Sequence, residues 1–307
     1  MKKTLLLYAV VAMFLFSCKK EHNSSANPSG KKYLVTFNVS NFLPQQGNFA
    51  LKHNVTNLAS SDTLTNLKGY LDVLYCFIYD PRHSGWPPTI IMQDSTMSNM
   101  GTITDSLYEG NYSVIVIAGK KGLSYSGVLE KPHDTEWGYG GKWQDAFRGQ
   151  GTFTVSNSPV NQVITLNRMV GKLEVQVLDH FPNNAKNLNV TINKEASVQE
   201  LTDLPPIGDT IVTFSKVLPI TAFLPAGNFT MDELIGNRYF PFSVTITCTD
   251  AANNIIASKV VNNVTILPNT KTILAGKLFT NAETIVIKAD TAWSNTPTTI
   301  NFSLRKH

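Results

Sequence analysis

Hydrophobic and polar residues alternate along most of this chain with a period of two. Between residues 243 and 249, Val244 and Ile246 fall on one side and the intervening threonines on the other, and residues 33–39 alternate in the same way. Because successive side chains of a β-strand point to opposite faces of a sheet, this pattern predicts strands with one buried and one solvated face. Other segments with strand character are residues 70–79, 112–118, 151–155, 160–166, 173–177, 188–192, 211–224, 255–266, 270–279 and 285–287.

The predicted strands are spread over the whole chain, with turn residues between them and hardly any helical periodicity. A single β-sandwich of about 290 residues would be unusually large, since most domains are much shorter. The sequence therefore predicts an all-β protein with two tandem β-sandwiches. We place the first at residues 33–166 and the second at residues 167–307.

The first residues have the composition of a secretion signal. Two lysines precede an apolar run at residues 5–16, and a serine and Cys18 follow it directly. Such a run is too short to cross a hydrocarbon core, which needs about 20 residues. Because a small residue before a cysteine resembles the lipobox of bacterial lipoproteins, we predict a lipoprotein signal peptide at residues 1–17, a lipid on Cys18 and a flexible tether at residues 18–32. The alternative is an ordinary signal peptide followed by an incidental cysteine.

Charged residues are scarce in this chain. They make up 16% of it, and the two lysines of the predicted signal peptide account for half of the net charge of +4. So small an excess of positive charge excludes nucleic acid as a partner. Abundant Thr, Asn, Ser and Val with little charge is typical of secreted β-rich proteins. Cys76 and Cys248 lie on apolar sides of predicted strands in different halves, so we expect two buried thiols and no disulfide.

The sequence carries no motif for catalysis or metal binding. The six histidines are scattered, and no pair of histidines or cysteines has the spacing of metal ligands. Nucleophile-elbow, Walker and dinucleotide-binding motifs are missing as well. We therefore predict a protein without enzyme activity, metal site or cofactor. Arg168, between the two predicted sandwiches, is expected to form a structural ion pair or to donate to a carbonyl oxygen, rather than to act as a catalytic cation.

Residues 130–145 are the one segment with candidate binding chemistry. Trp137, Tyr139 and Trp143 lie there among carboxylates and glycines. Such rings stack on sugars while carboxylates accept hydrogen bonds from sugar hydroxyls, so these three residues are candidate ligands for a glycan. The other interpretation is that the two tryptophans close over the open end of the first sandwich, because aromatic residues in long loops supply burial.

The last residues form a further candidate strand. Ile300, Phe302 and Leu304 alternate with polar residues and would present one apolar face. The simplest prediction is an edge strand of the second sandwich. The alternative is a strand exchanged with a neighbouring subunit, in which main-chain hydrogen bonds supply affinity and alternate side chains fill pockets.

Several short motifs follow the lipobox along the chain. The most specific is Leu166-x-Arg168-x-x-Gly171-Lys172-Leu173-x-Val175, and the others are residues 71–80, residues 107–114, residues 269–278 and a late Trp293. With these motifs the chain resembles the fimbrial anchoring-subunit lipoproteins related to the fimbrillins of Gram-negative gut and oral bacteria. The resemblance implies two transthyretin-like sandwiches of about seven strands each.

The resemblance also implies a function. It indicates a non-enzymatic lipoprotein that attaches a surface fibre of related β-sandwich shaft subunits to the outer membrane, with the lipid on Cys18 as anchor and β-strand addition as the coupling. The alternative function is a surface lipoprotein that binds a glycan or host ligand through residues 130–145.

Overall fold

The structure is a computed structural model, and it is built almost entirely of β-strands. It describes residues 30–40, 67–83, 85–202, 210–219, 229–236, 240–280, 285–290 and 297–299. The helical segments in this part of the chain are single turns: α2 (Leu67–Tyr70), η2 (Pro81–His83) and η3 (Pro132–Asp134). The all-β prediction is therefore confirmed. Cys18 and the predicted strand residues Ile300, Phe302 and Leu304 lie outside the described residues.

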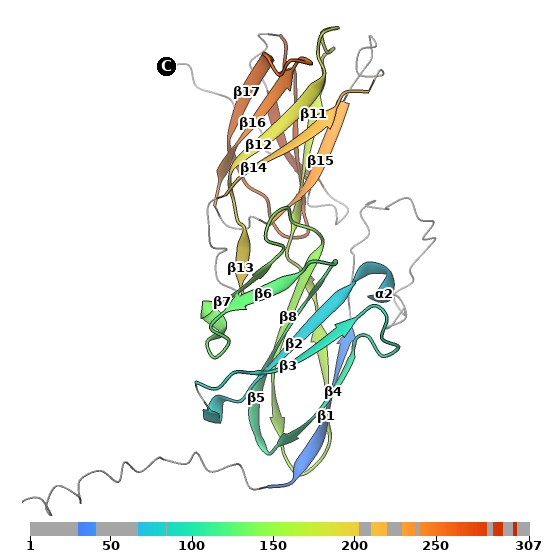
Figure 1. Cartoon of the computed structure of the whole chain (residues 1–307), viewed down its shortest axis with the longest axis vertical. Helices are drawn as coiled ribbons and strands as arrows, with labels where there is room; N and C mark the ends of the chain where they lie inside the picture. Colours follow the sequence, from blue (N-terminus) through green and yellow to red (C-terminus); the bar gives the residue numbers. More distant parts are fainter. Residues whose placement is uncertain are drawn as a thin grey trace, which may run out of the picture.

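The first sandwich consists of two sheets (Figure 1). The three-stranded sheet has the order β4 (Thr102–Tyr108), β1 (Lys32–Ser40), β9 (Val160–Thr165). The five-stranded sheet has the order β10 (Asn167–Arg168), β8 (Ala146–Val155), β5 (Gly110–Gly119), β2 (Val73–Tyr79), β3 (Thr89–Asp94). Side chains such as Phe37, Leu74, Ile103 and Val116, all fully buried, fill the space between them. They form one apolar core, as alternation along the strands predicts.

The second sandwich also pairs two sheets. One has the order β15 (Phe229–Ile235), β11 (Gly171–Val177), β18 (Lys271–Gly276), β19 (Ile285–Asp290), β20 (Pro297–Thr299). The other has the order β14 (Thr210–Val217), β12 (Asn187–Glu195), β16 (Phe242–Thr249), β17 (Ile255–Val264). Their inward side chains, including Leu173, Leu188, Val244 and Leu274, make a separate core. The two tandem sandwiches are thus confirmed, while their limits at residues 33–166 and 167–307 stay a prediction.

The opening strand of each sandwich has the same two kinds of neighbour. β1 pairs antiparallel with β4 and parallel with β9, and β11 pairs antiparallel with β15 and parallel with β18. Parallel neighbours need a long connection, so the partners are far apart in the sequence. The two halves therefore repeat one topology that local sequence patterns do not reveal.

A fifth, three-stranded sheet lies between the two sandwiches (Figure 1), and we call it the junction sheet. It has the order β13 (Val198–Glu200), β7 (Thr135–Gly138), β6 (Ser124–Gly127). β6 and β7 come from the first half of the chain, whereas β13 follows β12 of the second sandwich. One antiparallel ladder therefore joins the two halves.

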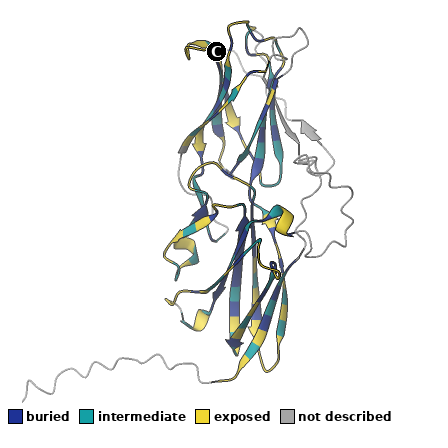
Figure 2. Cartoon of the chain, turned by 45° about the vertical axis from the view of Figure 1, so that its right-hand side comes forward, coloured by how far each residue is buried: buried dark blue, intermediate teal, exposed yellow. Residues whose placement is uncertain are grey.

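The junction sheet explains the two dense apolar runs of the sequence. On β2, Leu74 and Cys76 point into the first core, while Val73 and Phe77 point to the opposite face and pack under the junction sheet. The same holds on β5, where Ile117 lies on the junction side with no exposed surface. Figure 2 shows the resulting continuous burial along these central strands. A strand covered on both faces needs apolar residues at consecutive positions rather than at every second one.

Candidate functional site

The predicted aromatic binding residues lie at the junction between the two sandwiches. Trp137 is on β7 and Trp143 in the loop after it, and their side chains are 1% and 4% exposed. The ring centroids are 6.0 Å apart in an edge-to-face arrangement, and Tyr139 meets Trp143 in the same way. With Phe77, Ile117 and several neighbours they form a buried group, which we call the junction cluster.

Both indole groups donate hydrogen bonds to the second half of the chain. The Nε1 of Trp137 donates to the carbonyl oxygen of Glu200 at 3.1 Å, and the Nε1 of Trp143 donates to that of Ala196 at 2.6 Å. Gly236 leaves room for the ring of Trp143, since a Cβ atom there would lie 2.2 Å from it. The rings therefore fasten the two halves together, and a buried indole pairs its N–H as expected.

The burial of these rings bears on the two roles predicted for residues 130–145, glycan binding and cover of a sandwich. Rings that stack on sugars need an open face, and neither Trp137 nor Trp143 has one. The hydroxyl of Tyr139 is also engaged, because it donates to the carbonyl of Asp145 at 2.7 Å and accepts from the backbone N–H of Lys120 at 2.8 Å. Burial is the role that the geometry supports, although the rings cover the junction rather than the open end of the first sandwich.

Polar side chains also fix β13 and the residue that follows it, one from the first half of the chain and one within the second half. Arg148 is buried and donates from Nε to the carbonyl oxygen of Leu201 at 2.7 Å. Gln199 donates from Nε2 to the carbonyl oxygen of Gly236 at 3.1 Å. Buried donors of this kind must be paired, so they fix the relative position of the strands that carry them.

Arg168 forms the structural ion pair that the sequence predicts. Its Nε and Nη2 atoms each lie 2.7 Å from one carboxylate oxygen of Asp145, and its side chain is 8% exposed. The guanidinium group also lies over the ring of Phe147, 5.3 Å from the centroid. A bidentate, stacked arginine holds one geometry, so the chain is fixed at the point where it enters the second sandwich.

Glu195 is the group at the junction that sequence reasoning missed. It is 1% exposed, and among the described residues neither carboxylate oxygen has a side-chain hydrogen-bond partner. Burial raises its pKa to about 8, and the nearby Glu233 adds to this, while a backbone contact at Gly236 and the charge of Lys142 oppose it. Strict alternation would place Glu195 outward, but β12 has a register shift between Ile192 and Glu195 that turns the side chain inward.

The C-terminal edge of the second sandwich carries the start of the predicted final strand. β20 pairs antiparallel with β19, with Thr298 opposite Ala289, and it lies at the margin of its sheet. The predicted strand at residues 298–304 stays a prediction beyond Thr299. Nothing further is described of the apolar positions Ile300, Phe302 and Leu304.

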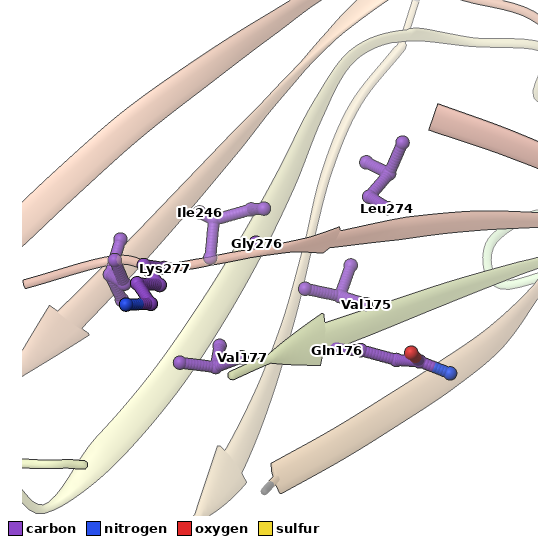
Figure 3. Close-up of a pocket in the computed structure, with 8 residues that line it drawn as sticks. Val175, Gln176, Val177, Ile246, Leu274, Gly276 and Lys277 are labelled. Atoms are coloured by element: carbon purple, nitrogen blue, oxygen red, sulfur yellow. The ribbon is translucent and has the colours of Figure 1, made fainter. Parts of the chain in front are cut away.

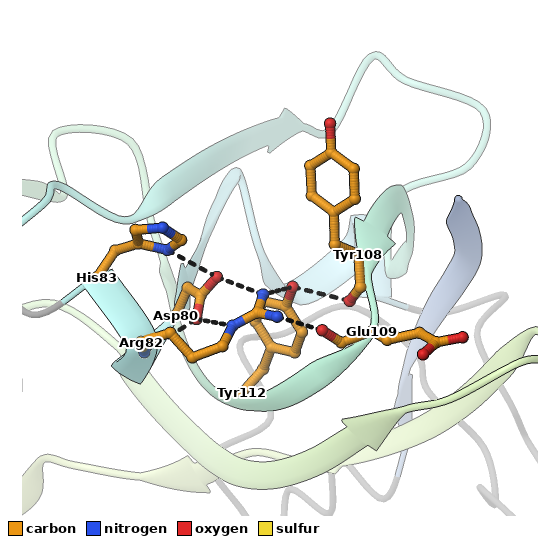
Figure 4. Close-up of polar contacts among 6 residues, drawn as sticks. All are labelled: Asp80, Arg82, His83, Tyr108, Glu109 and Tyr112. Carbon is orange, nitrogen blue, oxygen red and sulfur yellow. Dashed lines mark hydrogen bonds and ion pairs between the residues drawn. The ribbon is translucent and has the colours of Figure 1, made fainter. Parts of the chain in front are cut away.

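A second polar group lies at the far end of the first sandwich (Figure 4). Asp80 receives hydrogen bonds from Arg82 at 2.8 Å and 2.6 Å, and Arg82 also bonds the hydroxyl of Tyr112 at 2.7 Å and the carbonyl oxygen of Glu109. These bonds from Arg82 hold the pKa of Asp80 below its ordinary value. His83 lies 3.1 Å from the same carboxylate.

The described residues show which metal-ligand clusters and cavities this part of the chain holds. They contain no group of three or more His, Cys, Asp or Glu side chains that could hold a metal ion. A hollow between the sheets of the second sandwich (Figure 3), lined by Val175, Ile246, Leu274 and neighbours, has room for about one water molecule, far less than a small-molecule site needs. Cys76 and Cys248 are buried free thiols, as predicted, and burial raises their pKa to about 12 and about 11. In the same part of the chain no helix has the length and hydrophobicity to span a bilayer.

The geometry thus defines a protein of two β-sandwiches joined by a shared sheet and by buried hydrogen bonds. A family model matches residues 131–303, which is more than half of the chain. The chain therefore belongs to that family, a family of unknown function (DUF6562). A comparison with curated proteins finds no match.

Solved structures share the fold of the chain. A candidate adhesin from Bacteroides thetaiotaomicron matches with a TM-score of 0.55 and 9% identity over 90% of this chain and 100% of that one. A candidate polysaccharide-binding protein from the same species also has a TM-score of 0.55, with 10% identity over 88% and 98%. The fimbrial anchor protein Mfa2 from Porphyromonas gingivalis has a TM-score of 0.47 and 10% identity over 84% and 96%. The fold expected from the sequence resemblance is confirmed by the first two.

Proposed function

We propose that this protein is a non-enzymatic subunit that attaches a surface fibre of β-sandwich proteins to the outer membrane, with a lipid on Cys18 as its anchor. The observation that carries the proposal is the separation of the two attachment points. The described chain enters at one end of the first sandwich, at Gly30, while the edge strand β20 belongs to the second sandwich (Figure 1). Attachment points on different domains suit a protein that links a membrane to a fibre.

Three further observations support this function. The shared fold with a candidate adhesin agrees with a place at the cell surface. The junction, with both indole groups hydrogen-bonded across it, suits a protein that carries load between two partners. No observation points to catalysis: the described residues hold no metal cluster, and the hollow in the second sandwich has room for about one water molecule. We do not extend the proposal to glycan binding by Trp137 and Trp143, because both rings are buried.

We further propose that the fibre attaches by β-strand addition at the C-terminal edge of the second sandwich. An unpaired edge presents free N–H and C=O groups that accept a strand from another chain. β20 is such an edge strand, since its sheet ends there in the described part of the chain. The alternating apolar residues that follow β20 would fill pockets at the contact with the neighbouring subunit, and these side chains would give specificity.

The test replaces Ile300, Phe302 and Leu304 together by serine in the full-length chain. We expect the variant to remain in the membrane fraction and to take up palmitate through Cys18, but to retain fewer fibres on the cell, counted by electron microscopy. The matched control replaces the alternate residues Thr299, Asn301 and Ser303 by alanine, which should leave the fibres in place.

Two outcomes would contradict the proposal at different points. Normal fibre retention in the serine variant would exclude the C-terminal edge as the coupling element. Unchanged membrane retention of Cys18→Ala, with no palmitate on the wild-type protein, would exclude lipid anchoring.

A further inference from the structure

The described chain begins beside a group of aromatic and basic side chains at the end of the first sandwich. Lys32 opens β1 directly opposite Tyr108 of β4, and its Nζ lies 4.9 Å from the centroid of that ring. Lys31 is placed in the same way over Tyr33, at 5.4 Å. Both lysines are exposed, so two cations lie next to the point where residues 18–29 join the sandwich.

Arg82 lies at the same end of the first sandwich and is held in place by its contacts with Asp80 described above (Figure 4). Arg82 reaches the β4–β5 turn through the carbonyl oxygen of Glu109. Gly110 in that turn has a φ of +155°, and a Cβ atom there would lie 2.6 Å from Cζ of Arg82. Only glycine fits such a position, so the arginine is packed tightly against the turn.

Trp86 is the last residue of this group, and the ring of His83 packs against it. The ring of His83, bonded to Asp80, lies 4.6 Å from the ring of Trp86 at an angle of 32°. The backbone N–H of Trp86 also donates to the carbonyl of His83 at 3.0 Å. The indole is nevertheless 50% exposed, in contrast to the buried Trp137 and Trp143. His83 therefore holds the indole in place while half of the surface of Trp86 stays exposed.

We call Lys31, Lys32, Arg82, Trp86 and Tyr108 the anchor-end surface. Its three cations, with the acidic Asp80 and Glu109 beside them, leave a net charge of +1. Tryptophan and tyrosine next to lysine and arginine are the residues that settle at the boundary between lipid headgroups and hydrocarbon. The composition therefore matches that of a lipid-facing surface with anionic headgroups.

The length of chain before the sandwich supports the same occupant. Eleven residues lie between Cys18 and Gly30, so twelve Cα–Cα steps join them. A chain of that length spans at most about 40 Å when fully extended, and a random coil of the same length spans about 20 Å. A lipid on Cys18 would therefore keep this end of the molecule close to the bilayer, whereas the second sandwich would lie farther away (Figure 1).

We infer that the anchor-end surface rests on the membrane, with Trp86 at the level of the lipid headgroups and Lys31 and Lys32 against anionic groups. The inference depends on the proposed lipid on Cys18. It goes beyond that anchor, because it assigns a defined docking surface, and hence a fixed orientation, to the first sandwich.

The experiment uses full-length lipidated protein in vesicles of zwitterionic and anionic phospholipids with brominated acyl chains. Subtracting the emission of Trp86→Phe from that of wild type isolates the fluorescence of Trp86. We expect this emission to fall to roughly half of its value in unbrominated vesicles, because an indole at the headgroup boundary meets the bromine atoms. The same subtraction with Trp137→Phe serves as control, and it should show no quenching, since that ring is buried.

The lysines are tested by the double substitution Lys31→Glu and Lys32→Glu. Charge reversal should reduce the quenching of Trp86, and more so at low salt. The matched control reverses Lys120 and Lys121, another adjacent pair, which follows β5 at the opposite end of the sandwich. That control should leave the quenching unchanged.

Sedimentation with the vesicles separates the two proposals. If wild type sediments and Cys18→Ala does not, but Trp86 is not quenched, the anchor is correct and the docking surface is wrong. If wild type stays in the supernatant as Cys18→Ala does, the anchor is wrong and the docking inference falls with it. Quenching that both lysine pairs alter equally would also contradict the inference.

Discussion

The five-stranded sheet of the first sandwich and the β14–β12–β16–β17 sheet of the second differ in what covers their outer faces. On the first, Phe77 and Ile117 point outward from the core and lie fully buried under the junction sheet. On the second, the corresponding face carries hydroxyl and amide groups in cross-strand pairs, such as Thr191 with Thr213 at 2.8 Å and Thr247 with Ser258 at 3.0 Å. These side chains remain partly or fully exposed.

The difference shows what a third layer requires of a sequence. The second sandwich needs apolar residues at every second position only, and its exposed face uses threonine, which suits strands without needing burial. The first sandwich buries both faces of β2 and β5. Its own half of the chain supplies only two strands of the junction sheet that covers them, β6 and β7. The third strand, β13, comes from the second half. The stability of the first sandwich therefore depends on the second.

Inserting a charge should give the largest difference in stability between the two outer faces. Ile117→Lys places an unpaired cation under the junction sheet, which we expect to cost about 3–5 kcal/mol or to unfold the first sandwich. Thr191→Lys, outward on the second sandwich, should change the free energy of unfolding by less than about 0.5 kcal/mol. Guanidinium denaturation followed by circular dichroism measures both. Similar losses for the two variants would contradict the comparison.

Truncating one indole at the junction should have the next largest effect. Trp137→Ala removes a fully enclosed ring and its hydrogen bond to β13, for an expected loss of about 3–5 kcal/mol. The control Trp86→Ala removes an exposed ring and should cost about 0.5 kcal/mol or less. Both are compared by denaturant titration. If Trp137→Ala is as stable as Trp86→Ala, the packing of Trp137 under the junction sheet is not needed for stability.

The smallest effect of a substitution at mildly acidic pH is expected at Glu195, and this effect changes with pH. Because its pKa of about 8 in the folded protein exceeds the ordinary value of 4.5, its contribution to stability is full below about pH 4.5. That contribution falls as the pH rises toward 8. At pH 5, Glu195→Gln should differ from wild type by less than about 1 kcal/mol.

The same variant provides its own control, since Gln cannot ionise. As the pH is raised from 5 to 8, wild type should lose more stability than Glu195→Gln, measured by denaturant midpoints at each pH. Parallel pH curves for the two proteins would show that the carboxyl group is not buried in the folded state.

Much of the fold could be predicted from local patterns. Strict alternation located β1, β11, β12 and β16, and the dense runs located β2 and β5. The junction sheet could not be found in this way, because its strands have three or four residues each, too few to show a period. β13 also finds its partner in the other half of the chain, a contact that no local pattern records.

The candidate site was predicted less well than the fold. The aromatic segment was recognised, and so was the ion pair of Arg168, since both depend on residue type. The direction of the rings could not be predicted, because it depends on β13 and on the space left at Gly236. Glu195 was missed because a bulge, rather than the alternation, decides where its side chain points.

The position of β1 has a mechanical consequence. β1 lies between two neighbours in its sheet, with seven residues in register with β4 and six with β9, so a pull on the chain before Gly30 is shared by two ladders. Ladder hydrogen bonds lie across the strand direction, so a pull along β1 loads them together in shear. A strand held in this way must break many bonds at once. An attachment through this end would yield to force slowly, with a lifetime set by the rate of unfolding rather than by equilibrium stability.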